Sequence, residues 1–131
     1  MSIFNNHSAE ILILLFFIFT YFLSVVEKLA DWKGTIAYYS NHFEKTILHK
    51  MIPLLLLNVL IFEILTVILL TIGLYFLVTE DALIMAKIGL EISAITLLMF
   101  LVGQRLAKDY PGAMNITIYF ILNVIGIYLL T

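Results

Sequence analysis

Ionisable side chains inside long apolar stretches are the residues of this sequence with the clearest chemical potential. Glu63 lies in an apolar stretch from 52 to 78, and Lys87 and Glu91 lie in another from 82 to 103. If these stretches cross a membrane, each charge costs about 2.5–3.5 kcal/mol on insertion scales, so each needs a partner or a function. Lys87 and Glu91 are four residues apart on one helical face, where we expect them to pair.

Glu63 differs from these two residues because no basic side chain is evident at its depth. We therefore expect its carboxyl group to be unpaired, which favours a functional role over a packing role for Glu63, and a titrating role is the hypothesis that this suggests. Asn58 lies in the same apolar stretch as Glu63, Asn123 lies in the stretch from 113 to 131, and both complete a candidate intramembrane polar site. These groups either fix helix packing through hydrogen bonds and ion pairs, or line a small cavity for a quinone, a lipid headgroup or a proton path.

Four stretches are long enough to position these residues within a bilayer. The composition is 63% hydrophobic and 12% charged, against about 45–50% and 25% in an average soluble domain. The stretches run over about 10–30, 52–78, 82–103 and 113–131, and roughly 20 apolar residues span a bilayer as a helix. In lipid only helices and closed barrels satisfy the backbone, and these stretches lack the alternation of barrel strands, so we expect helices. We predict an all-α, single-domain membrane bundle of four helices over residues 1–131.

The link between the first two stretches is too long for a tight hairpin. Trp32, Ile36, Tyr39 and Phe43 follow one another at intervals of four, three and four residues, so they share one helical face. This pattern predicts an amphipathic interfacial helix over about 32–44. Such a helix either anchors against the bundle or acts as a lid over a cavity that opens to that side.

Basic residues are concentrated in the first and third loops. Only Lys87 lies toward the opposite face, and the remaining basic residues are Lys28, Lys33, Lys45, Lys50, Arg105 and Lys108. The positive-inside rule places loops one and three in the cytoplasm and both termini outside. Arg105 lies eighteen residues after Lys87, on the same helical face, which we expect to point into the bundle or toward a partner protein.

Several kinds of chemistry are disfavoured by composition. The sequence contains no cysteine, which excludes disulfides, thiolate metal sites and iron–sulfur ligation. His42 and His49 lack a third metal ligand, and no histidine lies within the predicted spans, so we expect neither a metal site nor axial haem ligation. No nucleophile–base pair and no basic cluster for nucleic acid is visible. We expect that the chain is not catalytic by itself.

Two segments resemble the DoxX family of small four-helix bacterial membrane proteins, in particular its short Bacteroidetes members. The segment from Ser24 to Gly34, SVVEKLADWKG, resembles the family's S/G-x-x-x-K-L/V-x-D-x-x-G pattern, and Glu63 lies where such proteins carry an acid. The segment from Gly103 to Ala113, GQRLAKDYPGA, is similar to the family's link between spans three and four. The matching order and spacing extend through nearly the whole chain.

This resemblance implies a multi-pass protein of the bacterial cytoplasmic membrane. It implies an accessory subunit of a larger, quinone-linked oxidoreductase complex, with other membrane subunits as partners and quinone as the one cofactor in view. The alternative is a small transporter or a lipid- or quinone-binding membrane protein. The family positions that carry over as candidate site residues are Lys28, Asp31, Glu63, Gln104 and Arg105.

Overall fold

The protein is built from helices. A computed structural model describes residues 2–131, with side chains from Asn6 onward. Within this part, the elements are α1 (Ser2–Ala30), α2 (Trp32–His42), a short 3-10 helix η1 (His49–Met51), α3 (Ile52–Glu80), α4 (Ile84–Leu106) and α5 (Tyr110–Leu130). The predicted all-α bundle is confirmed.

Four of these helices have the length and composition of membrane spans, namely Asn6–Ala30, His49–Glu80, Ile84–Leu106 and Tyr110–Leu130. They coincide with the predicted stretches to within a few residues. The chain is therefore a multi-pass membrane protein. Large apolar side chains cover the outside of the bundle, as lipid contact requires; Phe19 is 61% exposed, Leu54 65% and Met114 64%.

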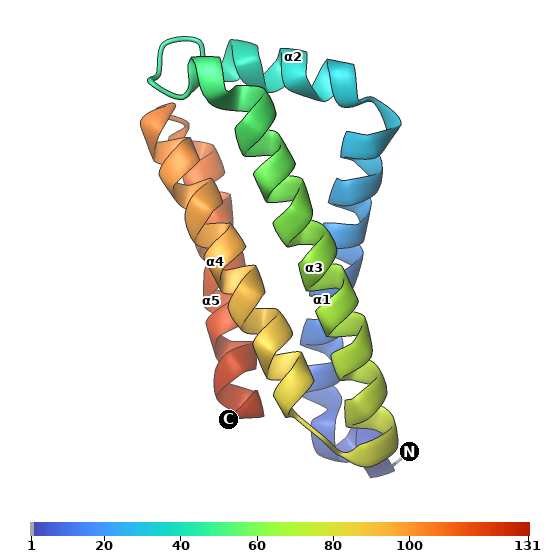
Figure 1. Ribbon diagram of the computed structural model, residues 1–131. Coiled ribbons are helices and arrows are strands. Elements are labelled where there is room, and N and C mark those ends of the chain that lie inside the picture. The colour runs from blue at the N-terminus through green and yellow to red at the C-terminus, as the bar shows by residue number, and fades with distance from the viewer. Residues whose placement is uncertain (1) are drawn as a thin grey trace.

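The spanning helices form an antiparallel bundle that α2 crosses at one end (Figure 1). Both termini lie at the opposite end. Helix α3 packs against α1 and α4, α4 also packs against α5, and α1 makes a smaller contact with α5. Below, the two ends are called the α2 end and the terminal end.

Close packing joins α3 to α4 near the terminal end. A Cβ atom on Gly73 would lie 2.5 Å from the Ala86 Cα atom, and one on Gly89 would lie 2.8 Å from Leu70 Cδ2. Glycine is therefore required for the two backbones to approach this closely. From this point the two helices separate toward the α2 end (Figure 1), so that the pair forms a V.

Helix α2 covers the α2 end of this V. The Asp31 side chain caps its first turn by accepting a hydrogen bond from the Gly34 backbone N–H at 3.0 Å, as N-cap residues do. The aromatic face packs inward, because Trp32, Ile36 and Tyr39 contact a buried cluster of Phe43, Ile52 and Leu56. A helix is present over Trp32–His42, compared with the predicted range of about 32–44, and it packs against the bundle; its location in the membrane interface stays a prediction.

Candidate functional site

A buried ion pair between α1 and α3 is the polar centre of the molecule. Lys28 Nζ lies 2.8 Å from Glu63 Oε1, and the two residues are 8% and 1% exposed. Lys28 Nζ also donates a hydrogen bond to Ser24 Oγ, 2.6 Å away and one turn earlier in α1. The expectation that Glu63 lacks a basic partner is therefore wrong.

The pair forms because α1 and α3 are antiparallel. Side chains on a helix lean toward its N-terminus. Lys28 therefore leans from the end of α1 into the bundle, whereas Glu63 leans from the interior of α3 toward the α2 end. Their charged ends meet although their backbones start at different depths.

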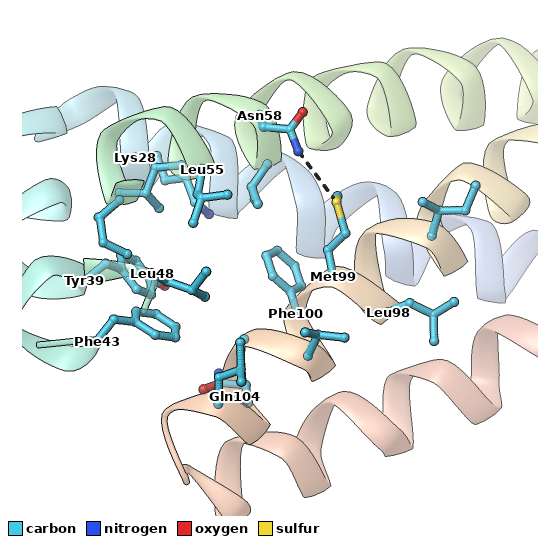
Figure 2. A pocket seen from close by; sticks show the side chains of 17 residues that line it. Lys28, Tyr39, Phe43, Leu48, Leu55, Asn58, Leu98, Met99, Phe100 and Gln104 are labelled. Atoms are coloured by element: carbon cyan, nitrogen blue, oxygen red, sulfur yellow. Dashed lines mark hydrogen bonds between the residues drawn. The ribbon is translucent and has the colours of Figure 1, made fainter. Parts of the chain in front are cut away.

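An apolar cavity of about 480 Å³ lies beside this ion pair, between the arms of the V formed by α3 and α4. Figure 2 shows Phe43 and Tyr39 on the α2 side and Met99 and Phe100 on α4. Its wall is completed by Leu48, Ile52, Leu55, Leu56, Val59, Ile95, Leu98, Val102, Gly103 and Leu106. Ligand sites typically have volumes of about 300–1,000 Å³ and mostly apolar walls, so this cavity has the size and character of one.

Four polar residues interrupt the apolar wall: Lys28, Tyr39, Asn58 and Gln104. The Asn58 amide donates to Met99 Sδ at 3.6 Å, a weak contact because thioether sulfur is a weak acceptor. Gln104 Oε1 is buried without a hydrogen-bond partner. Burial raises the pKa of the Tyr39 phenol, so its hydroxyl remains a hydrogen-bond donor. The cavity therefore offers both donors and an acceptor.

A second, polar hollow of about 330 Å³ adjoins the first at the junction of α1 and α2. Lys28 and Tyr39 line both hollows. The remaining residues of the polar hollow are Ser24, Glu27, Asp31, Gly34, Thr35 and Tyr38. Lys28 thus stands between an apolar space in the bundle and a polar space at its end.

A mostly apolar layer, in which the buried Asn123 amide donates to the Leu90 carbonyl oxygen, lies between the ion pair and the terminal end of the bundle. Leu14, Leu70, Leu77 and Leu90 are 0% exposed and Phe17 is 1% exposed. A layer of this kind does not provide a polar route across the bundle. The geometry therefore favours access to the site from the α2 end or from the bilayer over conduction through the protein.

Not all predicted site residues gather at this cavity. Asn123 is fully buried, and its Nδ2 donates to the Leu90 carbonyl oxygen at 2.8 Å, which is a packing role between α4 and α5. Arg105 is exposed, with its guanidinium carbon 5.3 Å from the centre of the Tyr110 ring. Lys28, Glu63, Asn58 and Gln104 are the predicted residues that lie at or beside the cavity, and Asp31 lies at the polar hollow.

The predicted pair of Lys87 and Glu91 is not formed. Among the side chains from residue 6 onward, no ion pair joins them; Lys87 is half-buried and Glu91 is exposed. The order of the two residues is unfavourable, because a helix pairs an acid with a base better when the acid comes first. Glu91 and Arg105 are exposed, so of the two predicted directions for this face the one into the bundle is wrong, and the one toward a partner protein stays a prediction.

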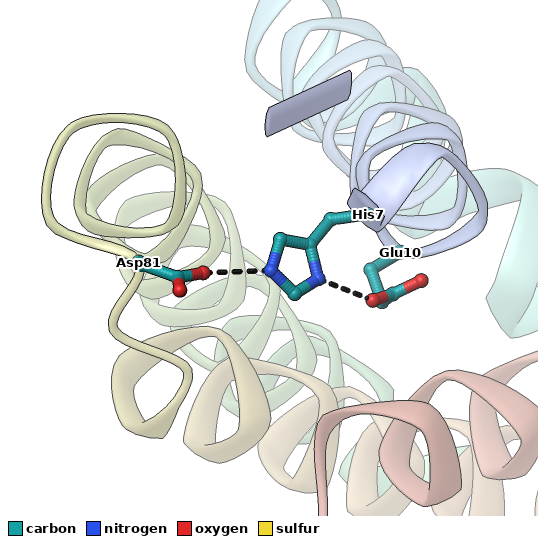
Figure 3. Close-up of polar contacts among 3 residues, drawn as sticks. All are labelled: His7, Glu10 and Asp81. Atoms are coloured by element: carbon teal, nitrogen blue, oxygen red, sulfur yellow. Dashed lines mark hydrogen bonds and ion pairs between the residues drawn. The ribbon is translucent and has the colours of Figure 1, made fainter. Parts of the chain in front are cut away.

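Two polar clusters were not found from the sequence. At the terminal end, His7 contacts Glu10 Oε2 at 2.7 Å through Nδ1 and Asp81 Oδ1 at 2.6 Å through Nε2, which ties α1 to the turn after α3 (Figure 3). In the core, Ser93 Oγ donates to the Tyr21 hydroxyl at 2.9 Å. The three-residue spacing of His7 and Glu10 is a visible signal, whereas the contacts with Asp81 and Tyr21 cross between helices.

Comparison with known proteins adds no identification. No protein-family model, no curated protein and no solved structure matches the chain. The resemblance to the DoxX family therefore stays a prediction, and the function is argued from the geometry of the site.

Proposed function

We propose that this membrane protein binds an amphipathic, membrane-soluble molecule, a quinone or a lipid, in the cavity between α3 and α4. The observation that carries this proposal is the Lys28 ammonium group at the edge of an apolar cavity of about 480 Å³. An ammonium group has three donors. Ser24 Oγ accepts from one of them, and the Glu63 carboxylate pairs with the positive charge at 2.8 Å without a hydrogen bond, which leaves at least one donor for an oxygen atom of the ligand.

The polar groups of the cavity also determine which chemical groups the headgroup of the ligand should carry. A ligand carbonyl oxygen accepts from Lys28 Nζ, and a ligand hydroxyl satisfies the unpartnered Gln104 Oε1. A quinone with its quinol form, or a lipid with carbonyl and hydroxyl groups, has this chemistry. The isoprenoid or acyl tail lies along the apolar wall, where its burial provides most of the binding free energy.

Trp32 provides a direct test, because it is the only tryptophan of the chain and it packs on the Phe43, Ile52 and Leu56 cluster beside the cavity. Quinones quench tryptophan fluorescence at short range. We expect a short-chain benzoquinone to quench Trp32 with saturation in the purified, full-length protein. Mass spectrometry of molecules extracted from that protein distinguishes a resident quinone from a resident lipid.

Gly103 supplies the matched variants for this test. A Cβ atom at Gly103 would lie 3.5 Å from Phe43 Cζ, which is ordinary contact, so Gly103→Ala should bind as the unaltered protein does. Gly103→Phe places a ring in the cavity and should abolish saturable quenching. Equal, unsaturable quenching in all three proteins, together with no amphipath in the extract, would refute the proposal.

The accessory-subunit hypothesis makes a different prediction for native membranes. We propose the bacterial inner membrane as the location, with the α2 end in the cytoplasm and both termini outside. After gentle solubilisation, stoichiometric co-migration with an oxidoreductase supports an accessory subunit, whereas migration without other proteins and with bound ligand supports independent binding.

A further inference from the structure

One face of α4 carries a regular stripe of exposed side chains, and toward the α2 end this stripe borders the ligand cavity. Its apolar members are Ile84, Ile88, Ile95, Leu98 and Val102, which are 37–61% exposed. Together with exposed Glu91, they follow one another at alternating intervals of four and three residues. This is the heptad spacing of helices that pack side by side along their whole length.

Glu91 makes this stripe unlike an ordinary lipid-facing surface. It lies ~10 Å along α4 from Ile84 at about 1.5 Å per residue, well inside a spanning helix. Among the side chains that the structure describes, it is the only exposed ionisable group so far from the end of a span. Hydrocarbon cannot solvate a carboxyl group, so this one requires a polar neighbour from outside the chain's own bundle.

Lys87 can form an ion pair with an acidic group on a neighbouring molecule. It lies one turn from Glu91 on the flank of the stripe, it is half-buried, and it forms no ion pair within the described side chains. The stripe therefore presents one acid and one base that are unpaired in the single chain. A surface with one charge of each sign is complementary to itself.

We propose that two copies of this chain dimerise through α4, with the Glu91 carboxyl group of each copy held by the Lys87 ammonium group of the other. Copies inserted in the same orientation are related by a two-fold axis along the membrane normal, and such an interface pairs each residue with its counterpart reciprocally. Lys87 and Glu91 are about 6 Å apart along the helix axis, a separation that the lysine side chain can bridge.

The apolar members of the stripe fit a second copy better than an unrelated helix. If Glu91 occupies a d position, the a positions are Ile88, Ile95 and Val102, and the other two d positions are Ile84 and Leu98. Branched residues at a with leucine at d favour parallel dimers, and a polar residue in the seam sets the register. Membrane helices pack mostly at the same shallow crossing angle as these coiled coils.

Disulfide cross-linking tests the position of the interface, because the natural chain has no cysteine. Full-length Ile88→Cys protein should form a disulfide-linked dimer on oxidation in phospholipid vesicles. Ile125→Cys is the control, since Ile125 is 47% exposed on α5 at a similar distance from the terminal end. Equal yields from both variants, or none from Ile88→Cys, would overturn the proposal.

Energy transfer between labelled copies in vesicles of increasing lipid content tests the role of the charges. Glu91→Leu keeps an apolar seam and should weaken dimerisation about tenfold, the size expected for interhelical polar contacts. Glu91→Lys should weaken it further, and the exchanged protein Lys87→Glu/Glu91→Lys should recover. Unchanged dimerisation of Glu91→Leu would overturn the proposal.

Cross-linking in native membranes distinguishes a second copy from a different subunit. If Ile88→Cys links to another protein while the purified chain is monomeric, the self-association proposal is wrong. Ile95, Leu98 and Val102 belong both to the stripe and to the wall of the ligand cavity, whereas Lys87, Ile88 and Glu91 do not line the cavity. The charge variants therefore leave the cavity wall unaltered, and saturable quenching of Trp32 by quinone in a monomeric charge variant would show that ligand binding persists when dimerisation fails.

Discussion

Two ion pairs of this protein differ in how much they can stabilise it. Lys28 and Glu63 are both largely removed from solvent, whereas Asp81 at the His7 contact is 66% exposed. Exposed pairs contribute about 0–1 kcal/mol because water and ions screen them. Removing one partner of a buried pair costs more, since the other charge is then left without compensation.

Replacement of Lys28 should therefore be strongly destabilising. Lys28→Met leaves the Glu63 carboxyl group buried and unpaired, and we expect the free energy of unfolding to fall by about 3–5 kcal/mol. The double variant Lys28→Met/Glu63→Gln removes both charges and should recover most of this loss. Reversible unfolding in detergent micelles gives the double-mutant cycle, and additive losses would show that the two residues do not interact.

Asp81→Asn is the matched change at the exposed pair. Asparagine tolerates the positive φ of 53° at this position as aspartate does, so only the charge is lost. We expect a loss below about 1 kcal/mol, measured by the same unfolding experiment. A loss as large as that of Lys28→Met would mean that the His7 contact is a main support of the terminal end.

At the scale of the elements, the cavity follows from the divergence of α3 and α4. Gly73 and Gly89 bring the two backbones together near the terminal end, while larger side chains such as Phe100 and Met99 lie between them at the α2 end. Helix α2 then places Tyr39 and Phe43 over the open end of the V. Its packing on the bundle fits the role of an anchor, and its position at the cavity fits the role of a lid. The two roles are compatible.

Glycine-to-alanine substitutions should have opposite effects on stability at the base of the V and at its open end. Gly73→Ala brings a methyl group to 2.5 Å from the Ala86 backbone, and we expect a net loss of about 1–3 kcal/mol from overpacking. Gly103→Ala meets only Phe43 at 3.5 Å and should gain up to about 1 kcal/mol from its better helix propensity. Thermal unfolding of the two variants checks the opposite signs.

At the scale of the whole molecule, the distribution of basic residues predicts its orientation in the membrane. The even number of spans puts both termini at one end (Figure 1), and the basic loops lie at the other. Because the chain lacks cysteine, single cysteines report topology directly. Lys45→Cys should react with a membrane-impermeant maleimide only after the cells are opened, whereas Thr79→Cys should react in intact cells. The reverse pattern would contradict the positive-inside assignment.

The sequence by itself determined the number and bounds of the spans and the presence of α2. Hydropathy and length decide which segments can leave water, and this depends on local composition alone. The intervals between Trp32, Ile36, Tyr39 and Phe43 likewise predicted the face that packs in α2. Candidate polar residues could also be named, because ionisable groups are rare in apolar stretches.

Only the tertiary structure decided what these polar residues do. Glu63 and Glu91 are both acids inside apolar helices, yet Glu63 is buried against Lys28 and Glu91 is exposed on the outer face of α4. A helix that is apolar all round has no polar face from which its inward side could be inferred. The inward side is set by which helices are neighbours, and here the glycine contacts of α3 and α4 and the antiparallel packing of α1 on α3 settle it.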